Sequence, residues 1–410
     1  MCFLVFNLSV CTYGQSWLWG KLGNSGHHST EPIALAIDKK DNVFLTGEYQ
    51  DSLTFGVYKF TTPNINAFLV KYDSNGNLLW AAQPITTNFS EGHSLSTDKS
   101  GNVYVAGYFQ NSLTFGTYTL TTTSNYAPFI AKYGPGGNII WAKQGTVTGF
   151  TYGISVATDL ANNSYITGYF SNQLTLGSYT LTAHGTDNIF IAKYDSNGNV
   201  LWVKQPYSNQ FSMGQAITSD ANGNIYLSGD FKDSLIFGTY ILNANNRQDI
   251  FLAKYDSSGN VIWAKQTTVP SSNSQGDVGS IITDGSGNIY LTGYFMDTIS
   301  FGSNSIYNNN AGKRGIFLAK YNSLGSAVWA ESSFSKYAND WQGFSVATDK
   351  SKQIYLAGGG LYGFPSFANY SIAFGADTLG EKQMHCVILI SLFLFKPYRV
   401  CSVIKRNSYL

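Results

Sequence analysis

The sequence predicts an all-β protein, built as a single β-propeller of about six four-stranded blades. A tryptophan recurs with a 61-residue period over most of the chain. The tryptophans at this spacing are Trp19, Trp80, Trp141, Trp202 and Trp263, and Trp329 follows 66 residues later. Short apolar segments within each repeat are separated by turn residues. No window of the sequence shows a sustained helical period, so repeated small sheets are expected.

Three further markers recur in phase with the tryptophans. An aspartate that precedes a turn is found at Asp38, Asp98, Asp159, Asp220, Asp284 and Asp349. A glycine in a motif of the L-T-G-E-Y type is found at Gly47, Gly107, Gly168, Gly229, Gly293 and Gly358. A Phe-Gly or Leu-Gly pair begins at Phe55, Phe115, Leu176, Phe237, Phe301 and Phe374. Four markers in one phase establish the repeat.

The second repeat unit illustrates the four strands expected in each blade. The first strand is predicted at Ser94–Asp98 and the second at Val103–Phe109, which is rich in β-branched and aromatic residues. The third is predicted at Phe129–Tyr133 and the fourth at Asn138–Lys143. The connection Gln110–Ala127 contains Leu-Thr-Phe-Gly and is long enough for a small extra hairpin. We expect the fourth-strand tryptophan to pack between neighbouring blades.

Counting the units predicts six blades. The propeller is assigned to residues 16–395, with units that start near residues 32, 92, 153, 214, 278 and 343. The sixth unit has a third strand expected near Cys386–Ile390 but no fourth strand of its own. The segment Ser16–Leu22 resembles a fourth strand and is expected to close the ring by completing the last blade. Seven or eight blades are expected if the C-terminal part is truncated or out of frame.

The two ends of the chain differ in composition from the repeats. Residues 1–15 begin with an apolar run and are interpreted as a secretory signal peptide, although no Lys or Arg precedes Lys21. Residues 396–410 form a basic tail that is interpreted as disordered or out of frame. The four cysteines lie outside residues 12–385, so no disulfide is expected in the body. No transmembrane helix is expected, because the C-terminal apolar run is too short.

Composition restricts the function classes. The chain has 25 basic and 24 acidic residues, only 12% charged residues and 15% aromatic residues. A nucleic-acid-binding protein would need a basic face, which this composition does not offer. The aromatic content excludes a disordered chain.

The motifs of Ser155–Phe170 and Phe190–Trp202, repeated in neighbouring units, resemble the SBBP (bacterial β-propeller) repeat family. The resemblance covers about residues 16–375. It implies a secreted or surface-attached protein of the kind found in Bacteroidetes. The family has no agreed catalytic residues, so the resemblance assigns none here. Proteins of this family often end in a sorting domain, which is not visible in this sequence.

Candidate sites are few. Turns of the form Asp-x-x-Gly-Asn, such as Asp256–Asn260, could hold calcium, but they lack the closing Glu of a calcium loop and are interpreted as structural. A ring of third-strand lysines could bind an anion, but we expect them on a solvent-facing side with their stems over aromatic rings. These lysines are Lys71, Lys132, Lys193, Lys254 and Lys320. The histidines show no metal-binding spacing, and no catalytic residue or cofactor is predicted.

A few residues depart from the repeat. Glu48 and Asp230 stand where other units have Tyr. Aromatic residues near the sixth unit could stack on sugars, although filling of blade interfaces is the favoured interpretation. These residues are Trp341, Tyr362, Phe364, Phe367 and Tyr370. No unit was expected to gather acids at the axis, which argues against a quinoprotein oxidoreductase.

The predicted function is therefore that of an exported, non-enzymatic and monomeric binding or scaffold module. Extracellular or cell-surface glycan is the first expected ligand, on the grounds of export, aromatic content and low charge. A surface protein bound for adhesion or structural support is the alternative partner. No nucleic-acid partner is expected.

Overall fold

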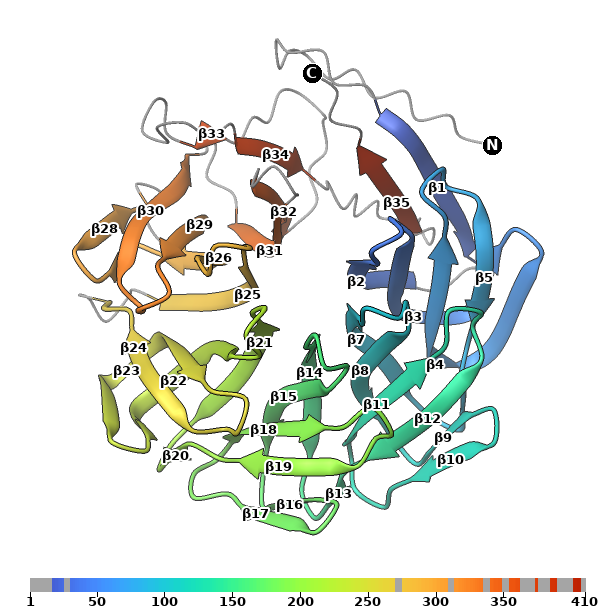
Figure 1. Cartoon of the computed structure of the whole chain (residues 1–410), viewed down its shortest axis with the longest axis horizontal. Coiled ribbons are helices and arrows are strands. Elements are labelled where there is room, and N and C mark those ends of the chain that lie inside the picture. Colours follow the sequence, from blue (N-terminus) through green and yellow to red (C-terminus); the bar gives the residue numbers. More distant parts are fainter. Residues whose placement is uncertain are drawn as a thin grey trace.

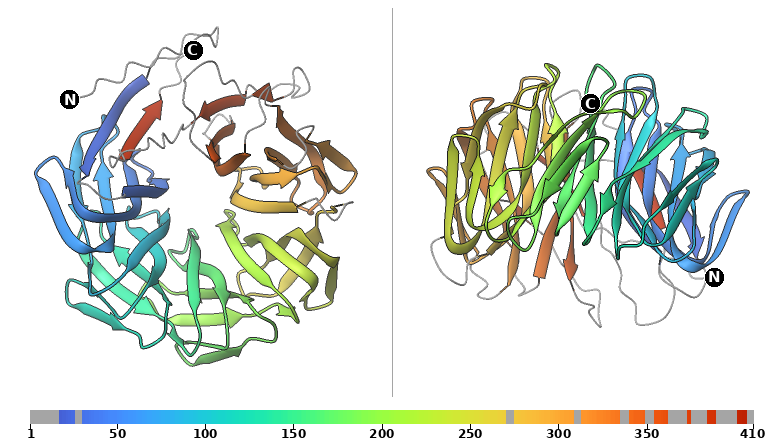
Figure 2. Two further views of the ribbon diagram at one scale, coloured as in Figure 1. Left: turned by 180° about the vertical axis from the view of Figure 1, so that it is seen from behind. Right: turned by 90° about the horizontal axis from the view of Figure 1, so that it is seen from below.

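The computed structural model describes residues 17–25, 30–269, 275–308, 313–334, 340–348, 354–361, 373–374, 384–388 and 401–406. Small antiparallel sheets follow one another around a common axis, as Figure 1 shows. Viewed from the edge in Figure 2, the strands run across the thickness of the disc, so the turns gather on two opposite faces. The protein is a β-propeller.

Five complete sheets are formed by the described residues up to Phe334. The first holds β2 (Thr30–Ile37), β3 (Val43–Phe55), β4 (Tyr58–Tyr72) and β5 (Leu78–Ala82). The second holds β7 (Ser90–Thr97), β8 (Val103–Phe109), β11 (Ala127–Tyr133) and β12 (Ile139–Gln144). The third holds β14 (Thr151–Thr158), β15 (Ser164–Phe170), β18 (Asn188–Tyr194) and β19 (Val200–Lys204). The fourth holds β21 (Ser212–Ser219), β22 (Ile225–Phe237), β23 (Tyr240–Tyr255) and β24 (Val261–Gln266). The fifth holds β25 (Gln275–Thr283), β26 (Ile289–Met296), β29 (Arg314–Tyr321) and β30 (Ala327–Phe334).

Each blade is an antiparallel sheet in which consecutive strands are neighbours. The first strands (β2, β7, β14, β21 and β25) lie nearest the axis in Figure 1, and the fourth strands lie at the rim. The second strand carries the recurring glycine because its neighbour leaves no room for a side chain. A Cβ on Gly107 would lie 1.9 Å from the carbonyl oxygen of Glu91. This close approach explains the glycine marker of the sequence.

The extra hairpin predicted after the second strand is confirmed. It is formed by β9 (Ser112–Phe115) with β10 (Tyr118–Thr121), β16 (Gln173–Leu176) with β17 (Tyr179–Thr182), and β27 (Thr298–Phe301) with β28 (Asn304–Tyr307). In the first and fourth blades it is continuous with the long second and third strands. Phe115 is buried and its ring centroid lies 5.3 Å from that of Phe129, so the Phe-Gly marker anchors the hairpin to the blade.

Short strands connect each blade to the next one. These are β6 (Ile85–Thr86), β13 (Thr146–Val147) and β20 (Tyr207–Ser208). They pair with the outer hairpin region of the following blade, for example Ile85 with Thr114 and Thr146 with Thr175. A single bridge between Thr268 and Ser300 repeats the connection between the fourth and fifth blades. Neighbouring blades are therefore joined by backbone hydrogen bonds as well as by side chains.

The predicted place of the tryptophan between blades is confirmed. The Trp141 indole Nε1 donates to the carbonyl oxygen of Ser196, which lies in the third blade, at 3.1 Å. The Trp141 and Tyr194 rings are stacked with centroids 6.4 Å apart. Trp80, Trp202 and Trp263 make the equivalent hydrogen bond to the blade that follows theirs.

The expectation that the third-strand lysines face solvent is wrong. Lys132 is 5% exposed, and its Nζ donates to the same Ser196 carbonyl at 3.1 Å. It also lies 3.7 Å from Asp98 Oδ2 and 5.0 Å from the Tyr104 ring centroid. Lys71, Lys193 and Lys254 are buried in the same way, and Lys320 is half-buried over Tyr290. The expected contact with an aromatic ring is correct, but the next blade covers the face assumed to be exposed.

We call each such group of aspartate, lysine and tryptophan a junction cluster. The aspartate at its centre also holds the turn between the first and second strands. Asp98 Oδ1 accepts the backbone amides of Ser100 and Asn102, at 2.9 and 3.0 Å. Asn102 Nδ2 donates to Asp98 Oδ2 at 2.7 Å. One buried carboxylate therefore links a turn to the blade interface, which explains why this aspartate recurs.

The C-terminal strands are less regular than the five complete blades. They are β31 (Asp340–Thr348), β32 (Ile354–Leu361), β33 (Ala373–Phe374), β34 (Met384–Ile388) and β35 (Cys401–Arg406), and β1 (Trp17–Ser25) pairs with β35. The third strand predicted near Cys386–Ile390 overlaps β34, but β34 is parallel to β32, whereas other third strands are antiparallel. The blade number and the closure of the ring remain predictions. Residues 1–16 and the predicted aromatic residues 362–370 lie outside the described residues, and Trp341 lies on β31 opposite Gly360.

Candidate functional site

One position of the repeat differs chemically from blade to blade. It lies at the end of the sheets opposite the aspartate turns, where a residue of the first strand pairs with a residue of the second strand. The pairs are Glu31 with Glu48, Glu91 with Tyr108, Tyr152 with Tyr169, Met213 with Asp230, and Asp277 with Tyr294. All are half-buried except Asp230, which is buried. We call this set the acid–tyrosine end.

The junction between the first and second blades brings two carboxyl groups together. Glu48 of β3 is hydrogen-bonded to Glu91 of β7, and burial together with the Glu91 charge raises the pKa of Glu48 to about 7. The Tyr108 hydroxyl donates to Glu91 Oε2 at 2.7 Å. This pair therefore keeps a proton in part of the molecules at neutral pH.

The junction between the fourth and fifth blades holds a second carboxyl pair at the same position. Asp230 of β22 lies beside Asp277 of β25, and burial followed by the Asp277 charge raises the pKa of Asp230 well above its ordinary value. Gln248 Nε2 donates to Asp230 Oδ2 at 2.7 Å. Gln215 Nε2 donates to Asp277 Oδ1, which also accepts the Val278 amide at 2.8 Å.

Aromatic rings occupy the junction between the second and third blades. The Tyr108 and Tyr152 ring centroids are 4.6 Å apart, and Tyr152 is 5.0 Å from both Tyr126 and Tyr169. Phe89 and Phe150 extend this half-buried group. The rings contact one another in stacked, tilted and edge-to-face arrangements. The group is continuous with Glu91 through Tyr108.

The opposite end of the blades contains a hollow of about 290 Å³, lined by the turns of the first three blades. Its lining includes Asp38, Asp98 and Asp159, which are all buried and bonded within their own turns. Lys39 and Lys99 line it as exposed side chains. The aspartates are thus structural, and the hollow also presents the exposed side chains of Ile37 and Leu160.

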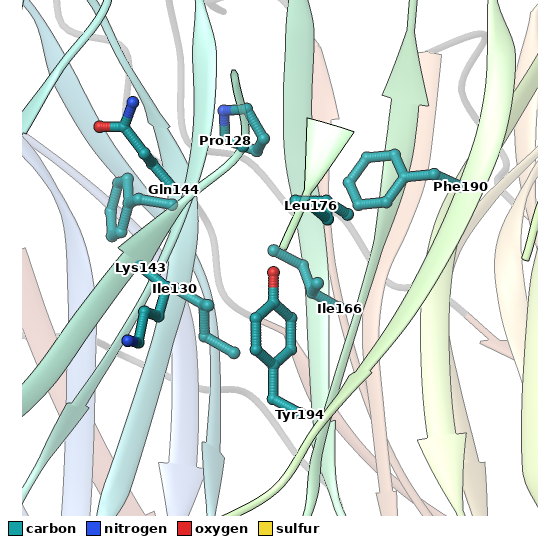
Figure 3. Close-up of a pocket in the computed structure, with 10 residues that line it drawn as sticks. Pro128, Ile130, Lys143, Gln144, Ile166, Leu176, Phe190 and Tyr194 are labelled. Carbon is teal, nitrogen blue, oxygen red and sulfur yellow. The ribbon is translucent and has the colours of Figure 1, made fainter. Parts of the chain in front are cut away.

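Figure 3 shows a second gap, between the second and third blades. The side chains that line this gap approach one another closely and leave no space for a water molecule. They include Ile130, Ile166, Leu176, Phe190 and Tyr194. This gap is part of the blade interface, and it does not accept a ligand.

The turns considered as calcium loops use their carboxylates internally. Asp73 Oδ1 accepts the amides of Asn75 and Asn77, both at 2.8 Å, and Asn77 Nδ2 donates to Oδ2 at 2.9 Å. The Asn77 side chain and amide hold the pKa of Asp73 below its ordinary value. Asp195 and Asp256 make the same bonds. Among the described residues, no three His, Cys, Asp or Glu side chains are grouped as a metal site would require.

Sequence reasoning identified only half of each carboxyl pair. Glu48 and Asp230 stand out in the sequence as departures from the repeat, whereas Glu91 and Asp277 do not, and the sequence predicts no gathering of acids. The structure corrects that expectation, because first-strand acids of one blade meet second-strand acids of the preceding blade. Aligning the first strands by the 61-residue period would have shown acids at both positions. The contact itself depends on how neighbouring blades approach one another.

No family model matches the sequence. The uncharacterized WD repeat-containing protein L264 of Acanthamoeba polyphaga mimivirus is 25% identical over 439 residues. The match covers 86% of this chain and 31% of that protein, so the chain spans about a third of the relative's length. A repeat-containing relative agrees with the repeated sheets described above.

Two solved structures have a low similarity to this chain. A protein of unknown function from Bacteroides caccae has a TM-score of 0.38 and 11% identity, covering 73% of this chain and 81% of that chain. Sqt1 from Chaetomium thermophilum has a TM-score of 0.34 and 6% identity, covering 82% and 97%. Similarity at this level carries no conclusion about function. No helix able to cross a membrane occurs in the part of the chain that the structure describes.

Proposed function

We propose that this protein is an exported, non-enzymatic propeller of the SBBP type that binds a basic segment of a protein partner through its acid–tyrosine end. The observation that carries the proposal is the variation at this one position. The neighbouring glycine and the junction clusters recur from blade to blade, whereas acids and tyrosines alternate here. A scaffold alone would need no such variation.

The chemistry of this end suits a basic partner. Glu31, Glu48, Glu91 and Asp277 are half-buried, so they combine contact with solvent and a fixed position. A carboxylate in such a place binds lysine or arginine side chains through charge-assisted hydrogen bonds. The tyrosine rings beside Glu91 add favourable faces for the same cations. Complementary charge would also steer the partner to this end of the disc.

A glycan is the second candidate ligand. The half-buried tyrosine group around Tyr152 favours it, since such rings can stack against the apolar faces of sugars. However, a neutral glycan could bond to the carboxyl oxygens only through its hydroxyl groups and would bring no positive charge to the two pairs. A basic polypeptide uses both the acids and the rings.

The test compares arrays of basic, neutral and acidic peptides with a glycan array, using the full chain. Binding of basic peptides that weakens about tenfold in Glu91→Gln supports the proposal. Lys99→Ala at the opposite end is the matched control, and it should bind as the unchanged protein does. Binding to glycans alone would replace the proposal with the second candidate.

We also propose six blades with the ring closed by β1. Trp19 pairs with Lys405 in the register that Trp80 makes with Lys71, and Asn24 and Ser25 pair with β3 as Ile85 and Thr86 pair with β9. These registers support β1 as the fourth strand of the last blade. A disulfide engineered between Gly20→Cys and Ile404→Cys should form and raise the melting temperature. Failure of these cysteines to react would argue against closure.

A further inference from the structure

Asp230 carries an oxygen that the protein does not satisfy. The residue is 1% exposed, and its Oδ1 has no hydrogen-bond partner among the described residues. A buried carboxyl oxygen without a donor is costly, so such atoms in folded proteins point to a ligand, an ion or a functional state. The other oxygen, Oδ2, accepts from Gln248.

The groups around Asp230 come from four other strands. Asp277 lies on β25, Gln215 on β21, Gln248 on β23 and Tyr294 on β26. Asp277 and Gln215 belong to innermost strands and are half-buried, so these two neighbours of Asp230 are in contact with solvent. Arg314 of β29 lies 4.1 Å from the Tyr294 ring centroid, and its charge acts on Asp277.

The other carboxyl pair shows how this site differs. Glu48 and Glu91 are hydrogen-bonded to each other, and Tyr108 donates to Glu91, so that pair finds its donors within the protein. At the Asp230–Asp277 pair the nearby amide groups of Gln215 and Gln248 are used on Asp277 Oδ1 and Asp230 Oδ2. Asp230 Oδ1 remains as an acceptor without a donor among the described residues.

We propose that the Asp230–Asp277 pair is a subsite for a primary ammonium group, supplied by a lysine side chain of the protein partner. This deepens the proposed function and rests on it. An ammonium is compact and has three donors, which matches a buried carboxyl oxygen without a donor. A guanidinium is larger and planar, and it would need a wider opening. Calcium takes six to eight oxygen ligands, whereas Gln215 and Gln248 direct their amide nitrogens at these carboxyl groups.

The test uses two capped peptides and one small amine. Binding of acetyl-hexalysine amide, acetyl-hexaarginine amide and n-butylammonium to the full chain is measured by isothermal titration calorimetry. We expect hexalysine to bind at least tenfold more tightly than hexaarginine. A Gly-Ser peptide with a free N-terminus distinguishes a terminal amine from a lysine side chain, and we expect it to bind more weakly than hexalysine.

Asp230→Asn is the central variant, because it keeps the shape of the side chain and replaces a carboxyl group that can ionise beside an ammonium with a neutral amide. We expect it to weaken hexalysine binding at least tenfold and to abolish the preference over hexaarginine. Lys99→Ala, an exposed side chain at the opposite end of the blades, is the matched control and should keep the preference. The melting temperature of each variant shows whether it has folded, and Asp277→Asn provides a second variant.

The outcomes separate the subsite from the proposed function. Basic peptides that bind equally well to Asp230→Asn would overturn the subsite and leave the function standing. Binding of n-butylammonium that depends on Asp230, without peptide binding, would support the subsite and overturn the polypeptide partner. Absence of binding by either peptide and by the amine would overturn both.

Discussion

The two ends of each blade junction are built from the same strands but are used differently. At the aspartate-turn end, the junction cluster recurs with nearly the same distances: Lys71 and Lys132 both lie 3.7 Å from their aspartates. At the acid–tyrosine end, the corresponding junctions hold a glutamate pair, a tyrosine pair, a tyrosine with a methionine, or an aspartate pair. The groups that stabilise the blade interfaces are therefore kept at one end of the repeat, while the residues at the other end vary and are available to recognise a ligand.

The largest loss of stability is expected for a substitution at the aspartate-turn end. Trp141→Ala would remove a buried ring and the Nε1 hydrogen bond to the Ser196 carbonyl. We expect it to lower the free energy of unfolding by about 3–5 kcal/mol, as for other large core truncations. Urea denaturation measures this change. Val57→Ala, at a side chain 91% exposed, is the control and should have little effect. A small loss for Trp141→Ala would show that the clusters do not hold the blades together.

A smaller loss of stability is expected when the aspartate of the same junction cluster is substituted. Asp98→Asn would leave Lys132 buried without its countercharge and would alter the turn. We expect a loss of about 2–4 kcal/mol in the same urea experiment. Asp73→Asn, at a turn of the same form that lacks a buried lysine partner in the structure, should cost clearly less. Equal losses at the two positions would contradict a role for the ion pair.

The acid–tyrosine end should contribute less stability as the pH rises, because of the Glu48–Glu91 pair. The pKa of Glu48 is raised from 4.5 to about 7 in the folded protein, so between these values the folded state binds more protons than the unfolded chain. The stability that Glu48 contributes is therefore present at low pH and lost as the pH rises through about 7. Glu48→Gln should flatten this part of the profile by about 1–2 kcal/mol, a range reduced for solvent screening.

Melting curves of both proteins between pH 5 and pH 8 measure the effect. The unchanged protein should lose stability relative to Glu48→Gln as the pH increases. A constant difference across this range would contradict the shared proton of the glutamate pair.

Much of the fold could be predicted from the sequence because each marker does one local task. Gly107 allows the close approach of a neighbouring strand, Asp98 caps a turn, and Phe115 anchors the outer hairpin. Contacts between blades could not be predicted in the same way. Lys132 looked exposed because a single sheet has a free face, and only the following blade covers it.

The dependence on contacts between blades also explains why the sequence did not predict the Asp230–Asp277 pair. Asp230 and Asp277 lie 47 positions apart in the sequence, and each looks like an isolated polar residue on its strand. The two residues are in contact because the fourth and fifth blades pack side by side. The residue spacing within one repeat unit does not predict this contact. The alternation of acid and tyrosine at one register was the available signal.

The most direct test of the account is hydrogen–deuterium exchange of the full chain with and without acetyl-hexalysine amide. We predict slower exchange at the starts of β7 and β25 and near the middle of β3 and β22, where the two carboxyl pairs lie. The aspartate turns at Asp98 and Asp159 should exchange as before. Protection confined to those turns would contradict the account, because it would place recognition at the end that we assign to stability.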